Sequence, residues 1–115
     1  MKGRITLAIL GLIALTGCKY DHEEDLHCDT SNVTYVNTIK PILEIRCYSC
    51  HSGAFPEAGY NLTDTGVVNR ITRNDILHSA VTTGAPVKMP LNGPYLTDCQ
   101  ISKIQAYKGG GLRYQ

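Results

Sequence analysis

The sequence predicts a small all-α domain of about three to four helices, and two observations support that prediction. Apolar residues recur at helical spacing in three segments, which begin near Thr38, Asn74 and Thr97. The stretches between them are rich in Gly and Pro, which favour irregular loops, and no alternation of strands and helices is visible. With 115 residues, the chain has room for one core and no second domain.

The N-terminal residues have the pattern of an export signal. Lys2 and Arg4 precede an apolar run over residues 5–15, and a small residue, Gly17, follows shortly after it. This order predicts that residues 1–17 are a signal peptide. A transmembrane anchor is the alternative, but it would need about 20 apolar residues, and this run is shorter.

The end of the signal also suggests how the protein is held on a membrane. Residues 15–18, Leu-Thr-Gly-Cys, resemble the lipobox of bacterial lipoproteins, which implies cleavage before Cys18 and lipid attachment to it. The mature protein is then anchored to a membrane facing the periplasm or the cell exterior. Lys19 stands where the inner-membrane retention signal of some bacteria would place Asp, which favours the outer membrane. Residues 18–30 are predicted to be an acidic tether, and residues 31–115 the folded domain.

The mature chain has almost no net charge. Removal of residues 1–17 takes away Lys2 and Arg4 but no acidic residue, which leaves nine Lys and Arg against ten Asp and Glu. This balance gives no electrostatic support for a nucleic-acid partner.

Five cysteines are divided among three predicted roles. Cys18 carries lipid, and Cys47 and Cys50 belong to one motif, so that Cys28 and Cys99 remain. An oxidising compartment favours a disulfide between these two. The alternative is two separate buried thiols.

Residues 47–51 form the motif that carries the chemistry. They are Cys-Tyr-Ser-Cys-His, and C-x-x-C-H is the attachment signature of c-type haem. On a helical face, Cys47 and Cys50 reach the two vinyl groups on one porphyrin edge, and His51 supplies an axial ligand to the iron. A thioredoxin-like redox pair would need a βαβ setting, and a zinc site would need two further ligands at suitable spacing. Neither is visible, so one covalent haem c is predicted.

The helix before the motif is predicted to begin at Thr38 as N-cap, with Pro41 in its first turn. Residues 52–66 carry Gly and Pro and are predicted to be a loop. Three apolar residues in and after this loop are expected to cover the haem: Leu62, Val67 and Val68.

Two more helices follow. The first is predicted from Asn74 as N-cap to Gly84 at its C-terminus, and it carries His78. The last is predicted to begin at Thr97, where Gln100 completes a capping box, and to end at the run of glycines 109–111.

Over residues 35–111 the chain resembles class I cytochromes c, and more closely the small cytochrome-like lipoproteins of bacteria. The resemblance rests on Ile-Lys-Pro-Ile-Leu at 39–43, the C-x-x-C-H motif, Met89-Pro90 and a last helix that ends in Gly. It implies a cytochrome c-like fold around one haem, with Met89 as the sixth iron ligand opposite His51. It also places an aromatic residue, here Tyr107, where the last helix crosses the first.

Met89 is the one methionine of the mature chain, and it lies in the Pro- and Gly-rich stretch 85–95, which is predicted to be irregular. If Met89 only packs against the haem, the iron is five-coordinate or is bound by His78.

The predicted function is that of an electron carrier, not an enzyme. With both axial positions filled, the iron has no vacancy for a substrate, and electrons pass between redox protein partners through the haem edge. One alternative is a five-coordinate haem sensor or weak peroxidase. Another is a haem-bearing module that docks onto a larger redox enzyme.

Overall fold

The computed structural model of the protein describes residues 27–84 and 87–115. The predicted signal peptide 1–17, the lipid site Cys18 and most of the tether lie outside these residues. Within the described ranges every regular element is helical and there is no strand, which confirms the all-α prediction.

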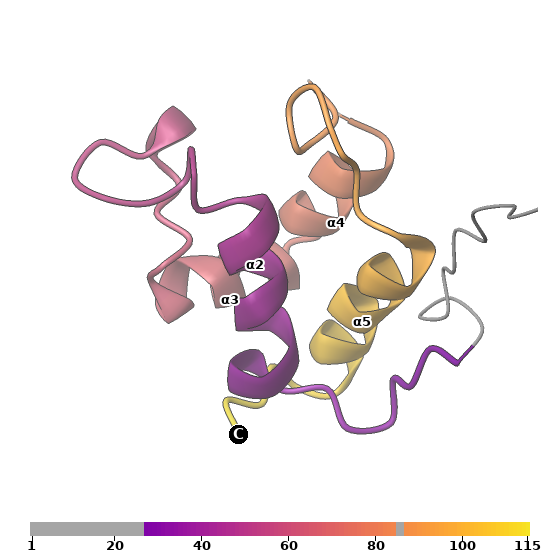
Figure 1. The fold of residues 1–115 in the computed structure, drawn as a ribbon. Coiled ribbons are helices and arrows are strands. Elements are labelled where there is room, and N and C mark those ends of the chain that lie inside the picture. Colours follow the sequence, from indigo (N-terminus) through magenta and orange to yellow (C-terminus); the bar gives the residue numbers. More distant parts are fainter. Residues whose placement is uncertain (1–26, 85–86) are drawn as a thin grey trace, which may run out of the picture.

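The helices pack against one another, and long irregular segments follow α2 and α4 (Figure 1). α2 continues the π-helical turn η1 directly, and α5 packs against η1, α3 and α4. The loop after α2 and the described residues 87–97 after α4 extend toward the same end of the molecule (Figure 1). The elements are η1 (Tyr35–Ile39), α2 (Lys40–Arg46), the short 3-10 turn η2 (Glu57–Gly59), α3 (Thr65–Arg73), α4 (Ile76–Thr82) and α5 (Asp98–Gly109).

The first helical segment begins one turn earlier than predicted. Thr34, not Thr38, is the N-cap, and its hydroxyl accepts a hydrogen bond from the N–H of Asn37 at 3.4 Å. The first two N–H groups of η1 donate to carbonyls of residues 113 and 114, at 2.8 and 3.1 Å. The C-terminal tail therefore satisfies donors that a helix N-terminus otherwise leaves open.

α3 was not predicted. Apart from the short turn η2, the loop prediction for residues 52–66 holds up to Asp64. The Asp64 carboxylate caps α3 by accepting the N–H groups of Gly66 and Val67 at 2.7 and 3.4 Å. Val68 and Ile71 then bury one face of the helix in the core. Asn74 ends α3, and so it is not the N-cap of the next helix as predicted.

The two later helices agree better with the sequence. α4 begins at Ile76, and the chain turns after it at Gly84, where a C-terminus was predicted. α5 begins at the predicted capping box, in which Thr97 and Gln100 each accept the other's backbone N–H. It ends in the predicted run of glycines.

Tyr107 is fully buried in the core, and its helix α5 packs against η1, which begins the first helical segment. The Tyr107 side chain has no exposed surface, and its hydroxyl donates to the side-chain oxygen of Asn69 at 2.7 Å. Burial raises the pKa of this phenol. Tyr107 thus joins α5 to α3 by both packing and a hydrogen bond.

Cys28 and Cys99 lie together, as expected for this pair. Their sulfur atoms are 2.11 Å apart, and 71 positions separate them in the sequence. The link ties the start of the folded domain to the first turn of α5. In the part of the chain that the structure describes, no helix has the length and apolar character needed to cross a membrane.

Candidate functional site

The C-x-x-C-H motif forms a hydrogen-bonded turn at the end of α2. The prediction placed it on a helical face, but α2 ends at Arg46, and Cys47 caps it by donating to the carbonyl of Leu43 at 2.8 Å. The carbonyl of Cys47 then accepts the N–H groups of Cys50 at 3.2 Å and His51 at 2.9 Å. Because these are the contacts of a helical turn, both cysteines and the histidine keep the relative placement that a helix would give them.

The motif lines a cavity of about 600 Å³. The other walls come from the end of α2, the loop around η2 and residues 89–94. An adjoining cavity of about 260 Å³ extends inward to side chains of α3 and α4, among them Ile71, Leu77 and Val81. The larger cavity lies in the range typical of cofactor sites. Four residues border both: Cys47, His51, Ala58 and Met89.

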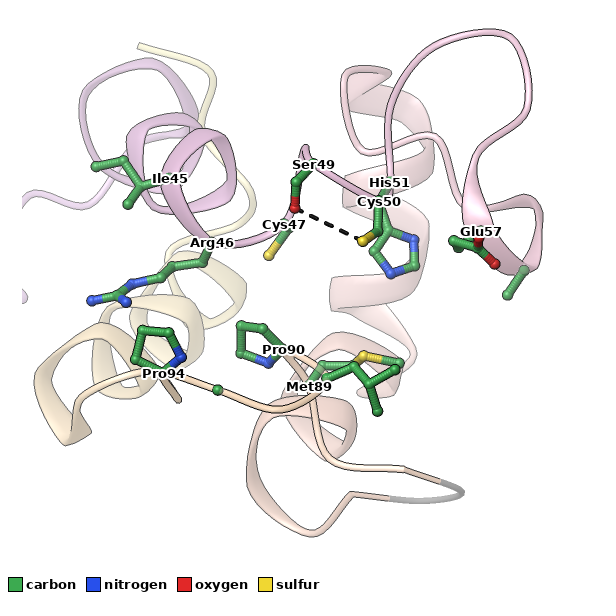
Figure 2. Close-up of a pocket in the computed structure, with 13 residues that line it drawn as sticks. Ile45, Arg46, Cys47, Ser49, Cys50, His51, Glu57, Met89, Pro90 and Pro94 are labelled. Atoms are coloured by element: carbon green, nitrogen blue, oxygen red, sulfur yellow. Dashed lines mark hydrogen bonds between the residues drawn. The ribbon is translucent and has the colours of Figure 1, made fainter.

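His51 and Met89 lie on opposite walls of this space (Figure 2). His51 is held on both sides, since its N–H donates to Cys47 and its carbonyl accepts the N–H of Leu62 at 2.8 Å. The imidazole Nδ1 is buried without a hydrogen-bond partner among the described residues. Met89 is held by its own N–H, which donates to the carbonyl of Ala80 on α4 at 2.8 Å.

Two charged side chains border the larger cavity at opposite ends, Arg46 and Glu57 (Figure 2). The Nε of Arg46 is buried and has no hydrogen-bond partner within the described ranges. A buried donor on a charged group is costly unless it is paired. The Arg46 end of the cavity therefore favours an anionic group.

The two motif cysteines are free thiols, with Cys47 half-buried and Cys50 exposed. Burial raises the pKa of the Cys47 thiol to about 11, and the charge of Arg46 offsets only part of this effect. Because the thiolate is the attacking species in disulfide exchange, this environment disfavours the thioredoxin-like alternative. Nor do the described residues contain a cluster of three His, Cys, Asp or Glu side chains that could serve the zinc alternative.

His78 does not reach this site. It lies on α4 but faces α5, where its Nε2 is 2.7 Å from the side-chain nitrogen of Gln105. It borders a separate surface depression with Thr72 and Lys108. Of the two residues considered for the position opposite His51, the structure brings only Met89 to the cavity.

The residues expected to cover the site are placed in part as predicted. Leu62 borders the inner cavity, whereas Val68 is fully buried in the core. Val67 packs against the core and borders neither of the two cavities. Both valines belong to α3, whose burial pattern turns them toward the other helices. Residues 87–95 are irregular, as predicted.

Arg46 was not predicted from the sequence as a site residue. Its position directly before Cys47, at the end of an apolar helix stripe, could have indicated that it borders the site. The inner walls from α3 and α4 also escaped prediction, because they depend on how those helices pack.

Comparison with protein-family models, curated proteins and solved structures finds no match to this chain.

Proposed function

We propose that this protein is a mono-haem c-type cytochrome that carries single electrons outside the cytoplasm. The observation that carries the proposal is that Cys47, Cys50, His51 and Met89 line one cavity of about 600 Å³. Two thiols three positions apart, an imidazole and a thioether are together the donor set of a haem c site. The all-helical fold agrees with the resemblance to class I cytochromes c.

The residues of the cavity fit such a group. Cys47 and Cys50 would form thioethers with the vinyl groups, and His51 and Met89 would bind the iron from its two faces. The Nδ1 of the His51 ring is buried without a partner among the described residues, which is unusual for a buried polar atom. Arg46, also without a partner at its Nε, supplies a cation for a propionate carboxylate.

A bound haem supplies an iron that alternates between the ferrous and ferric states. The thioether of Met89 is a soft ligand, which favours the ferrous state and raises the reduction potential relative to two imidazoles. The apolar side chains of α3 and α4 exclude water from the inner wall, which has the same effect on the potential.

The arrangement supports electron transfer better than catalysis. His51 and Met89 together leave no coordination position for a substrate, so electrons would pass at the haem edge. Cys50 is exposed and the side chain of Leu91 is 61% exposed, so this edge faces solvent. The partners are then a redox protein donor and acceptor. Lipid on Cys18 would hold the domain on a membrane, with the outer membrane favoured.

Covalent attachment tests the proposal directly. The exported protein should keep its haem through a denaturing gel and acid-acetone extraction, and a Cys47→Ser variant should lose most of it. Ser49→Ala is the matched control, because it changes the motif without removing a cysteine or the histidine. If acid-acetone removes the haem from the wild type, or the exported protein takes up none, the assignment is wrong.

The ligand state tests the carrier role separately. The reduced wild-type protein should bind carbon monoxide poorly, because Met89 occupies the sixth position. Ready binding would replace the carrier with the five-coordinate alternative, a sensor or weak peroxidase.

A further inference from the structure

We infer that Gly84 is a positioning residue for Met89, because its missing side chain lets the backbone of Lys88 approach the end of α4. The inference rests on the proposed function, in which the Met89 thioether binds the iron. Gly84 lines neither of the two cavities. Its effect would therefore act through the backbone.

The contact at Gly84 leaves no room for a side chain. The residue has φ of +71°, and its N–H donates to the carbonyl of Ser79 at 3.0 Å, which ends α4. A Cβ added at Gly84 would lie 2.6 Å from the backbone nitrogen of Lys88 and 2.7 Å from its Cα. Because these are backbone atoms, they cannot move aside without moving the next residue, Met89.

Met89 itself is attached to the same helix. Its N–H donates to the carbonyl of Ala80 at 2.8 Å, and Ala80 borders the inner cavity. Lys88, the residue before Met89, makes a cation–π contact within the same loop, in which its ammonium lies 4.5 Å from the ring centroid of Tyr95. The position of Met89 over the cavity is thus set by α4, through one close approach and one hydrogen bond.

This placement matters because a thioether is a weak iron ligand. A small displacement of Met89 raises the fraction of molecules in which the sixth iron position is open. An added ligand binds only to these molecules, so its apparent affinity rises with that fraction. Imidazole binding to the ferric protein, followed by its optical spectrum, measures this gain without any assay of electron transfer.

The experiment compares Gly84→Ala with Gly111→Ala. Gly111 also follows a helix in the left-handed conformation, with φ of +82°, but a Cβ there meets nothing within 4 Å. Both variants place Ala at a positive φ, and only Gly84→Ala adds the clash. Gly84→Ala should bind imidazole on the order of tenfold more tightly than the wild type, and Gly111→Ala should match the wild type.

Gly84→Asn distinguishes the effect of the clash with Lys88 from the effect of the positive φ at Gly84. Asn tolerates the left-handed region but carries the same Cβ, so it should behave like Gly84→Ala. Wild-type imidazole affinity in Gly84→Asn would overturn the inference. If neither variant at Gly84 folds, hydrogen exchange on the wild-type holoprotein tests the attachment of Met89 to α4, on which the inference depends. The Met89 amide should be protected, and rapid exchange overturns the inference.

The two proposals fail in different ways. A wild type without covalent haem, or without the near-infrared sulfur-to-iron band, refutes the proposed ligand set and this inference with it. A wild type that shows both, together with unchanged imidazole affinity in Gly84→Ala, refutes only the role of Gly84.

Discussion

Replacing Tyr107 by Phe should lower the free energy of unfolding by about 1 kcal/mol, and replacing it by Ala should lower it by about 3–5 kcal/mol. The Phe variant keeps the fully buried ring and loses one hydrogen bond, from the hydroxyl to Asn69 at 2.7 Å. Asn69 is half-buried, so water can replace the lost donor and keep the cost small. The Ala variant also leaves a cavity between α5 and α3, which the helices cannot fully close.

The difference between wild type and the Phe variant should depend on pH in one direction. Burial raises the pKa of the Tyr107 phenol above its ordinary value of 10. As pH rises past that value, the phenol ionises first in the unfolded chain, which stabilises the unfolded state of the wild type. The advantage of Tyr107 over Phe should therefore be constant below about pH 10 and shrink above it.

Urea unfolding of the holoprotein, followed by the helical circular dichroism signal, measures these differences. Tyr95→Phe is the control, because Tyr95 is 49% exposed and should change stability by less than about 0.5 kcal/mol. A loss above about 3 kcal/mol for Phe would contradict the small cost expected for losing the hydrogen bond to Asn69. A loss below about 1 kcal/mol for Ala would show that Tyr107 does not fill the core as described.

Four further outcomes are expected. Replacing both Cys28 and Cys99 by Ser opens a loop spanning 71 positions and should lower the free energy of unfolding by at most ~4 kcal/mol in urea; no loss would mean that the thiols are not linked. Asp64→Ala removes the α3 cap and should cost about 1 kcal/mol in the same assay, with Asp64→Asn close to wild type. Met89→Ala should keep covalent haem, lose the near-infrared band, fall in reduction potential and bind carbon monoxide; an unchanged band would remove Met89 from the iron. Arg46→Gln should lower the potential in redox titration, because a cation near the iron disfavours the ferric state, whereas Arg46→Lys should retain most of it.

Local patterns in the sequence were enough for several features. The structure has helices in all three segments where the apolar periodicity predicted them. The Thr97 capping box depends only on residues three positions apart. The C-x-x-C-H motif is likewise local, and its turn is closed by bonds within residues 47–51. Such features need no knowledge of distant chain segments.

α3 shows where local reasoning was too weak. Asp64 is a good N-cap, but Gly66 in the first turn and the β-branched valines after it lower the intrinsic helix propensity. The helix is favoured because Val68 and Ile71 bury against α4 and α5. Its start could not be inferred without that packing.

The start of the first helix was decided in the same way. Thr34 and Thr38 are equally good caps by residue type. The C-terminal tail, almost 80 positions away in the printed sequence, supplies carbonyls to the first turn after Thr34 and so selects it.

The sequence by itself determined the helical class, the cysteine-histidine motif and the short set of residues that could lie opposite His51. Only the tertiary structure decided between Met89 and His78. The apolar face of α4 turns Leu77 and Val81 to the cavity, and His78, about 100° around the helix from Leu77, faces α5 instead. The hydrogen bond from Met89 to Ala80 then brings the methionine to the cavity wall. Both outcomes depend on how helices pack, which residue spacing alone does not specify.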